Sequence, residues 1–316
     1  MDLRGWLPIY TYWSGDRFLV DWCYTGGQRF TDPFFGDTVD RLCGDLAVRL
    51  FRHQTGMEAA QEWNECSPGL APSGFLFHMS RCGSTLVSQM LAAAPRNRVL
   101  SEPTALNGLF RAALLRPGIP RATLVDWLRT VVGAMGRPLE GESRYFLKLD
   151  CWHVLALPLI VEAFPETPWI FLHRDPAEVL VSQMKLPGAW TVPSVLEPEV
   201  FGMKPEETRG MPMLEYRARL LAAIGTAALR HRKCGRGRLV NYQELPGWVS
   251  ASLPGHFHLA FDQAELERMG QAARWDAKTP QMEFSSDRRE KLMSVTPEIQ
   301  SAVDRWLAPV FGQLAP

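Results

Sequence analysis

Hydrophobic residues in this chain come in two alternating patterns, short apolar runs and longer amphipathic stretches. The apolar runs, rich in β-branched and aromatic residues, are typical of strands covered on both faces. They predict strands at residues 74–79, 98–100, 145–149, 169–172 and 238–240. The stretches between them predict helices at about 84–94, 105–115, 124–135, 154–164, 176–185 and 214–232. Because alternating strands and helices form parallel sheets, we predict an α/β fold, a P-loop-like three-layer sandwich around a central parallel sheet.

The first 70 residues have a different pattern, with ten aromatic side chains crowded into residues 6–35. The run 17–22 has strand character, and the amphipathic run 39–51 predicts a helix with Asp37 and Thr38 as caps. We predict an α+β accessory module at 1–70, a turn-rich linker at 67–73 and a main domain at 74–316. Two interpretations of the aromatic residues stay open, a packed core or a wall that recognises an acceptor molecule.

Composition narrows the classes of function. The chain has 34 basic and 34 acidic residues, a balance that argues against a protein that coats nucleic acid. Its longest apolar stretches are shorter than the roughly 20 residues of a membrane span, and the N-terminus lacks a signal-peptide pattern. Six scattered cysteines without paired spacing suggest free thiols and no zinc site. We therefore expect a cytoplasmic protein that binds neither a metal, a nucleic acid nor a membrane.

The segment from Ser80 to Leu86 joins the first predicted strand of the main domain to its helix. A turn of small residues at this position aims backbone N–H groups and the helix N-terminus at an anion. Gly83 allows close approach, Ser84 and Thr85 add hydroxyl groups, and Arg81 adds a forked cation. The loop lacks the lysine of a Walker A motif, because Ser84 follows Gly83. The alternative interpretation is an ordinary turn with Ser84 as helix cap.

A second segment lies at the end of the strand predicted at 169–172. Arg174 follows this strand, Pro176 is suited to open the next helix, and Ser182 lies two helical turns beyond Arg174. Ligands of open α/β sheets bind at this edge of the sheet. The alternative interpretation is a surface pair of Arg174 and Asp175.

Together these segments resemble the sulfotransferases that use 3′-phosphoadenosine-5′-phosphosulfate (PAPS). The run 80–86 is similar to the family's 5′-phosphosulfate loop, in the arginine-containing form of protein-tyrosine and many bacterial members. Arg174 and Ser182 resemble its 3′-phosphate motif, and Tyr242 its adenine-side tyrosine. The resemblance covers about residues 74–290 and implies a PAPS site made by one set of residues: Arg81, Cys82, Gly83, Ser84, Thr85, Leu86, Arg174, Ser182 and Tyr242.

The sequence also departs from that family. Cys82 replaces a serine or glycine, and Asn241 stands where arginine is common. The Arg-Lys-Gly loop of the cytosolic branch is missing. Its place as a third contact to the 3′-phosphate falls to residues 274–280 or 287–289, and the sequence does not choose between them.

The resemblance further implies three catalytic residues. Glu102 matches the base of the protein-tyrosine branch, Arg81 would stabilise the leaving phosphate, and Lys148 would touch the sulfuryl oxygens. The catalytic histidine of the cytosolic branch falls where Asp150 stands, so Asp150 and His153 are alternatives as the base. Two structural interpretations stay open: Glu102 as the cap of a helix starting near residue 104, and Lys148 as a solvated lysine.

We therefore predict a transferase that moves a sulfuryl group from PAPS to a hydroxyl or amine of a small molecule, without a metal. The acceptor would be enclosed by the loop 188–213 and by the aromatic module. The alternatives are a P-loop kinase for small molecules or nucleotides, and a non-catalytic nucleotide-binding protein. The sequence leaves the acceptor and the oligomeric state open, and a homodimer is one option.

Overall fold

Five parallel strands form the central sheet, one at each predicted position. They are β4 (Gly74–His78), β5 (Asn97–Ser101), β6 (Arg144–Lys148), β7 (Trp169–His173) and β8 (Gly237–Asn241). Their order is β5-β6-β4-β7-β8, and all neighbours are parallel. The structure is a computed structural model that describes residues 3–279, 282–285 and 287–314. Because β4 is central, the loop that follows it lies in the middle of the sheet's carboxyl edge.

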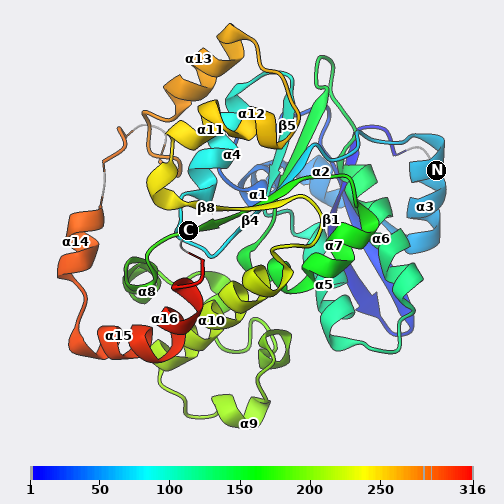
Figure 1. Cartoon of the computed structure of the whole chain (residues 1–316). Coiled ribbons are helices and arrows are strands. Elements are labelled where there is room, and N and C mark those ends of the chain that lie inside the picture. The colour runs from blue at the N-terminus through cyan, green and yellow to red at the C-terminus, as the bar shows by residue number, and fades with distance from the viewer. Residues whose placement is uncertain (1–2, 280–281, 286, 315–316) are drawn as a thin grey trace.

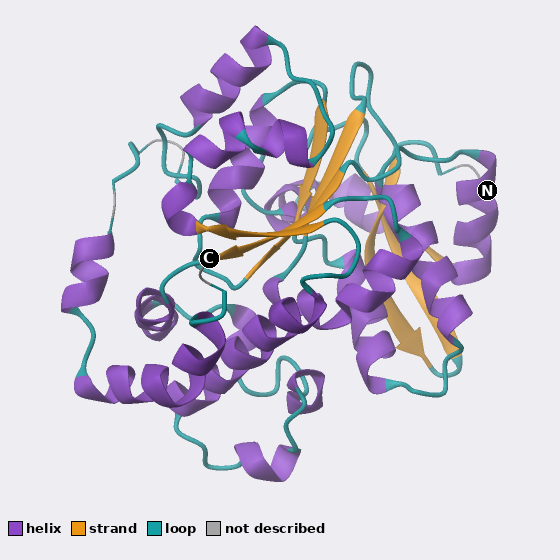
Figure 2. Cartoon of the chain, in the orientation of Figure 1, coloured by secondary structure: helices purple, strands orange, loops and turns teal. Residues whose placement is uncertain are grey.

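Helices cover both faces of this sheet, which confirms the predicted three layers (Figures 1 and 2). One face carries α4 (Ser84–Ala93), α11 (Gly247–Ala251), α12 (Leu253–His256) and α13 (Gln263–Ala272). The other carries α5 (Ala105–Leu115), α6 (Arg121–Met135), α7 (Leu157–Ala163), α8 (Pro176–Lys185) and α10 (Met213–His231). Shorter helices complete the fold: η1 (Cys151–Ala156), η2 (Ala189–Thr191), η3 (Pro198–Phe201), α9 (Pro205–Thr208), η4 (Tyr242–Glu244), α14 (Arg288–Met293), α15 (Pro297–Ala302), η5 (Val303–Leu307) and α16 (Ala308–Phe311).

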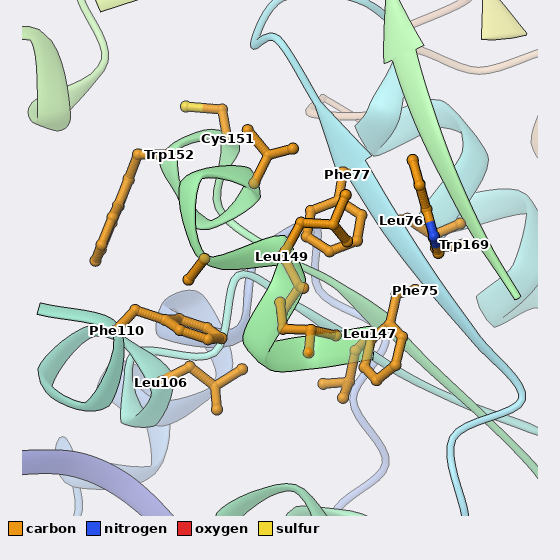
Figure 3. Close-up of a cluster of buried hydrophobic side chains, with 14 of the residues drawn as sticks. Phe75, Leu76, Phe77, Leu106, Phe110, Leu147, Leu149, Cys151, Trp152 and Trp169 are labelled. Atoms are coloured by element: carbon orange, nitrogen blue, oxygen red, sulfur yellow. The ribbon is translucent and has the colours of Figure 1, made fainter. Parts of the chain in front are cut away.

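The core lies where β4, β6 and β7 meet the helices of the second face. Figure 3 shows one cluster of buried side chains that runs from Phe110 of α5 and Trp152 of η1, past Phe77 and Leu147, to Trp169 on β7. All five side chains are almost fully buried. Burial of each such side chain contributes about 1.5–3 kcal/mol, so this cluster holds the strand ends rigidly in place.

The N-terminal residues form a second, antiparallel sheet of β1 (Trp6–Ser14), β2 (Arg17–Tyr24) and β3 (His53–Gly56). Helices α1 (Phe35–Cys43), α2 (Leu46–Leu50) and α3 (Met57–Cys66) accompany it. Most of its aromatic side chains are buried or half-buried, and the Phe18 ring stacks on Trp127 of α6 with centroids 4.5 Å apart. The module therefore packs directly against the main domain, as Figure 1 also shows.

Two predicted helices differ in detail. The helix expected at 39–51 is two helices, because the chain breaks at Gly44 and Asp45 caps α2 by accepting from the Ala47 N–H at 2.8 Å. The expected caps are also wrong, since Asp37 and Thr38 lie inside α1.

The helix expected at 154–164 begins earlier, as η1, with Asp150 as its cap. It becomes α-helical only at Leu157, where Pro158 occupies the first turn and removes one N–H donor.

Within the described residues, no helix combines the length and the apolar character needed to cross a membrane.

Candidate active site

The loop between β4 and α4 has an unusual backbone. Ser80, Arg81 and Gly83 all lie in the left-handed region, with φ of 72°, 53° and 83°. A Cβ on Gly83 would lie 2.8 Å from Leu245 and 2.9 Å from Tyr242, so glycine is required there for space as well as for φ. Non-glycine residues with such φ persist only where the surroundings hold them, and they cluster at functional sites.

Buried side chains hold this loop. The Ser80 N–H donates to His78 Nδ1 at 3.0 Å, and Gln183 of α8 donates to the Ser80 hydroxyl at 2.8 Å. The Cys82 thiol donates to the Leu172 carbonyl at 3.2 Å, and burial raises its pKa to about 12. Cys82 is therefore a protonated structural contact that ties the loop to β7, which explains how a cysteine fits at this position.

A cavity of about 330 Å³ lies against this loop, at the carboxyl edge of the sheet. Every residue predicted to bind the donor lines it: Arg81, Cys82, Gly83, Ser84, Thr85, Leu86, Arg174, Ser182 and Tyr242. The two C-terminal segments considered in the sequence add Asp276, Ala277, Lys278 and Asp287, and sequence analysis missed the other lining residues: Lys185, Leu186, Phe284, Ser285 and Lys291. The lining thus carries five lysine or arginine side chains and two aspartates, which favours an anionic ligand.

Arg174 is buried at the end of β7 and already has acidic partners. Its Nε donates to Glu178 Oε2 at 2.8 Å, and a second nitrogen donates to Glu178 and to Asp287 Oδ1, the latter at 3.0 Å. Its guanidinium lies 4.1 Å from the centroid of the Tyr242 ring. Burial alone would lower the pKa of Arg174, but the bonds to Asp287 and Glu178 raise it, so the group stays charged. The surface pair with Asp175 is not formed, because Asp175 caps α8.

Ser182 lies on α8 with its hydroxyl oxygen buried and without a hydrogen-bond partner among the described residues. A buried hydroxyl without a partner costs free energy, so its presence in the cavity wall needs a reason. A ligand that accepts a hydrogen bond beside Arg174 supplies one.

Glu102 forms a partly buried ion pair with Lys148, so Lys148 is not the solvated lysine of the alternative interpretation. Lys148 Nζ lies 2.6 Å from Glu102 Oε1, and the lysine side chain has no exposed surface. His78 Nε2 lies 3.3 Å from the same carboxylate oxygen. Burial raises the pKa of Glu102, but Lys148 and His78 outweigh it and hold that pKa far below its usual range. Glu102 also has a φ of 58°, and no side chain caps α5.

The two alternative bases differ from each other. His153 is fully buried, its Nδ1 accepts the Asp150 N–H at 3.2 Å, and its Nε2 lies 2.9 Å from Asn107 Oδ1. Burial lowers the pKa of His153 to about 3, so this ring is neutral and structural. Asp150 is half-buried, and burial together with the charge of Glu102 raises its pKa to about 7.

Phe34 of the N-terminal module lies between two lysines of this centre. Lys148 Nζ is 4.7 Å from the centroid of its ring, and Lys278 Nζ is 5.8 Å from it. Burial and the charges of Arg81 and Lys148 lower the pKa of Lys278 to about 8. Three cations from three parts of the chain, Arg81, Lys148 and Lys278, are thus close enough to influence one another, and the carboxylate of Glu102 lies near them.

The C-terminal residues that line the cavity come only in part from the two segments considered in the sequence. From 274–280, Lys278 and its two preceding residues line the cavity, while Pro280 lies outside the described residues. From 287–289, only Asp287 lines it, and Arg288 and Arg289 line a separate surface hollow. Lys291 lines the cavity instead and pairs with Asp287 at 2.6 Å. Lys278 lay in one of the two candidate segments, whereas no sequence signal marked Lys291, because this part of the chain reaches the cavity only through long-range packing.

The fold and the site define an α/β protein with an anion-binding loop after the central strand and a cationic cavity beside it. Residues 75–199, which contain this loop, Glu102, Lys148 and Arg174, match the sequence model of the Sulfotransferase family. Over this segment the chain is similar to the sulfotransferase family. The predicted closeness to the protein-tyrosine branch stays a prediction.

Solved structures of sulfotransferases share this fold. One from Mycobacterium avium has a TM-score of 0.50 and 16% identity, with 80% of this chain and 81% of that chain covered. One from Mycobacterium tuberculosis has a TM-score of 0.46 and 15% identity over 80% and 81%. One from Alicyclobacillus acidocaldarius has 0.42 and 15% over 76% and 96%. A search of curated protein sequences finds no significant match.

Proposed function

We propose that this enzyme transfers a sulfuryl group from PAPS to a hydroxyl or amine of a small-molecule acceptor and releases adenosine 3′,5′-bisphosphate. One observation carries the proposal. The nine residues predicted from sequence to hold the donor line a single cationic cavity at the carboxyl edge of the sheet. The prediction drew on three separate segments of the chain, so their meeting at one cavity supports one ligand.

The two ends of the donor have different partners in this proposal. The loop 80–86 and the N-terminus of α4 receive the 5′-phosphosulfate, where backbone N–H groups favour an anion. Arg174 and Ser182 receive the 3′-phosphate, and Tyr242 lies beside the adenine. Arg174 donates a hydrogen bond to Asp287 in the structure, so the 3′-phosphate has to compete with this carboxylate for the guanidinium.

The chemical step breaks the bond between sulfur and the bridging phosphate oxygen and forms a bond between sulfur and the acceptor oxygen or nitrogen. The acceptor loses its proton to a base, and the leaving phosphate keeps the bonding electron pair. Such transfers depend on positioning and on charge neutralisation. Arg81, Lys148 and Lys278 are the cations we assign to this neutralisation.

Glu102 is the base in this proposal, and its ion pair with Lys148 sets its pKa. In the ligand-free chain the ion pair makes Glu102 a weak proton acceptor. A bound phosphosulfate attracts the Lys148 ammonium, and weakening the pair raises the basicity of Glu102 when the donor is present. Asp150 is the second candidate because its pKa of about 7 suits proton transfer near neutral pH.

Calorimetric titration with adenosine 3′,5′-bisphosphate, beside ATP with magnesium, tests the donor site. We expect the bisphosphate to bind and Arg174→Ala to weaken it by about ten- to a hundredfold, the loss of a charge-assisted hydrogen bond pair. Arg236→Ala is the control, since Arg236 pairs with Glu166 at the exposed surface. Binding of ATP but not of the bisphosphate would support a kinase and overturn the proposal. Bisphosphate binding without any PAPS turnover would support a non-catalytic protein.

A further inference from the structure

A second cavity of about 440 Å³ lies between the N-terminal sheet, α5 and the 188–213 loop. Its floor is one face of α5 with the residues on either side of it: Thr104, Asn107, Arg111 and Leu115 follow at intervals of about one helical turn, and Arg116 comes directly after the helix. The side walls are residues 10–13 of β1 and Glu197 of the loop. We call this cavity the α5 groove. Over the twelve residues from Thr104 to Arg116 a helix rises about 18 Å, so the groove is elongated.

One end of the groove lies beside the catalytic centre. Thr104 follows Glu102 by two residues, and its hydroxyl donates to the Ile9 carbonyl of β1 at 2.6 Å. Asn107 meets the His153 ring, which in turn accepts the N–H of Asp150. This end of the groove therefore lies close to Glu102 along the chain and is linked to Asp150 through His153.

The other end of the groove is cationic. The Arg116 guanidinium lies 4.6 Å from the centroid of the Trp13 ring, and its side chain has no acidic or hydrogen-bonding partner among the described residues. Arg111, one turn nearer the centre, is neutralised by Glu197. Arg116 is thus the cation of this groove whose hydrogen-bond donors are available to a ligand.

The groove walls also contain two buried polar atoms without a partner in the described part of the chain. These atoms are Trp13 Nε1, a donor, and Glu197 Oε2, an acceptor. Both residues line the groove. Buried polar atoms are nearly always hydrogen-bonded, so two such atoms in one groove indicate a ligand that satisfies them.

We infer that the α5 groove binds the acceptor, and that the acceptor is an elongated hydroxy acid. Its hydroxyl lies at the Thr104 end near Glu102, its apolar body follows the line where β1 contacts α5, past Ala112 and Leu115, and its carboxylate lies at Arg116. This inference rests on the proposed function, because only a sulfuryl transfer needs a hydroxyl at that end.

The test measures PAPS-dependent sulfation of ω-hydroxy fatty acids of ten, twelve and sixteen carbons and of primary alcohols of the same lengths. We expect the acids to be the better substrates by about tenfold in kcat/KM, as a charge-assisted hydrogen bond gives. Arg116→Ala removes this advantage by raising KM for the acids only. Arg121→Ala is the matched control, since Arg121 forms an exposed pair with Glu162.

A second variant tests the direction of the groove. Leu115→Trp fills the Arg116 end, so KM rises for the sixteen-carbon acid, whose carboxylate has to reach Arg116, and changes little for the ten-carbon alcohol, which is shorter and has no group to place there. Equal losses for acids and alcohols in Arg116→Ala, or no sulfation of any hydroxy acid, overturn the inference. Calorimetry with adenosine 3′,5′-bisphosphate on the same samples separates the outcomes. Retained binding leaves the donor site standing, whereas absent binding means that the proposed function has failed.

Discussion

The donor cavity and the α5 groove are built in opposite ways. Most of the donor cavity comes from short motifs that follow strands, at places where the parallel fold brings strand ends together. The groove comes from β1, a helix face and a loop, and the sequence pointed to it only through the crowded aromatic residues and the loop 188–213, without a motif. A motif can thus reveal the site for a shared co-substrate, whereas the site for the variable substrate depends on how separate layers pack.

The largest effect is expected from removing Glu102, the base in the proposed function. Glu102→Gln should lower kcat by about 10²–10⁴, the usual contribution of general base catalysis, and leave bisphosphate affinity within a few-fold. Initial rates with PAPS and calorimetry measure the two effects. Because the substitution leaves Lys148 buried without its partner, it also destabilises the fold.

The double variant Glu102→Gln with Lys148→Met controls for that loss, since it removes both charges of the pair. A double variant that melts near the wild type yet stays inactive supports a catalytic role. If instead Glu102→Gln keeps its rate while Asp150→Asn loses it, together with a rise of activity near pH 7, Asp150 is the base.

The donor cavity should respond to pH through Lys278. Its pKa of about 8 means that the ammonium is charged below that pH and is lost as the pH rises through it. We expect bisphosphate affinity to fall by up to about tenfold between pH 7 and pH 9, since an anion binds the charged form. Lys278→Arg keeps its charge over this range and should flatten the profile, which calorimetry at three pH values would show. A wild-type profile unchanged by the substitution would exclude Lys278 as the cause.

A smaller effect of opposite sign is expected at Asp287. This carboxylate pairs with Arg174 and competes with a phosphate for the same guanidinium. Asp287→Asn should therefore tighten bisphosphate binding several-fold, because a half-exposed pair is worth up to about 1 kcal/mol. Glu166→Gln is a control, since Glu166 pairs with Arg236 at the exposed surface and neither residue lines the cavity. Weaker binding in Asp287→Asn would mean that Asp287 orients Arg174 and does not compete with the ligand.

The smallest effect on activity should come from a substitution in the N-terminal module. Phe34→Leu removes the aromatic ring from Lys148 and Lys278 while keeping an apolar side chain. Exposed cation–π contacts contribute about 0.5–1 kcal/mol, so we expect a two- to fivefold change in kcat/KM for PAPS. Phe51→Leu, at an exposed position of the same module, should have no effect.

Local patterns predicted the parts of the molecule that depend on neighbouring residues. The five strands, Pro176 at the start of α8 and the loop 80–86 follow from runs of a few residues, and the structure has each of them. Glu102 and Lys148 were named separately, but their ion pair joins residues 46 positions apart and has no local signature.

The same reason explains what sequence analysis missed. Asp287 reaches Arg174 across 113 positions, and Lys278 and Phe34 meet from opposite ends of the chain. Cys82 looked like a departure from the family until the structure showed its bond to the Leu172 carbonyl.

Phe34 shows that the main domain cannot be treated separately from the N-terminal module. The family match begins at residue 75, yet a ring from residue 34 lies beside two of the cations assigned to the reaction. In the proposed function, the residues that surround these cations therefore extend beyond the segment that matches the family. A chimera that joins this main domain to another N-terminal module would keep the whole loop 80–86. It would lose the Phe34 ring beside Lys148 and Lys278, which changes the surroundings of both charges, so the two parts have to be exchanged together.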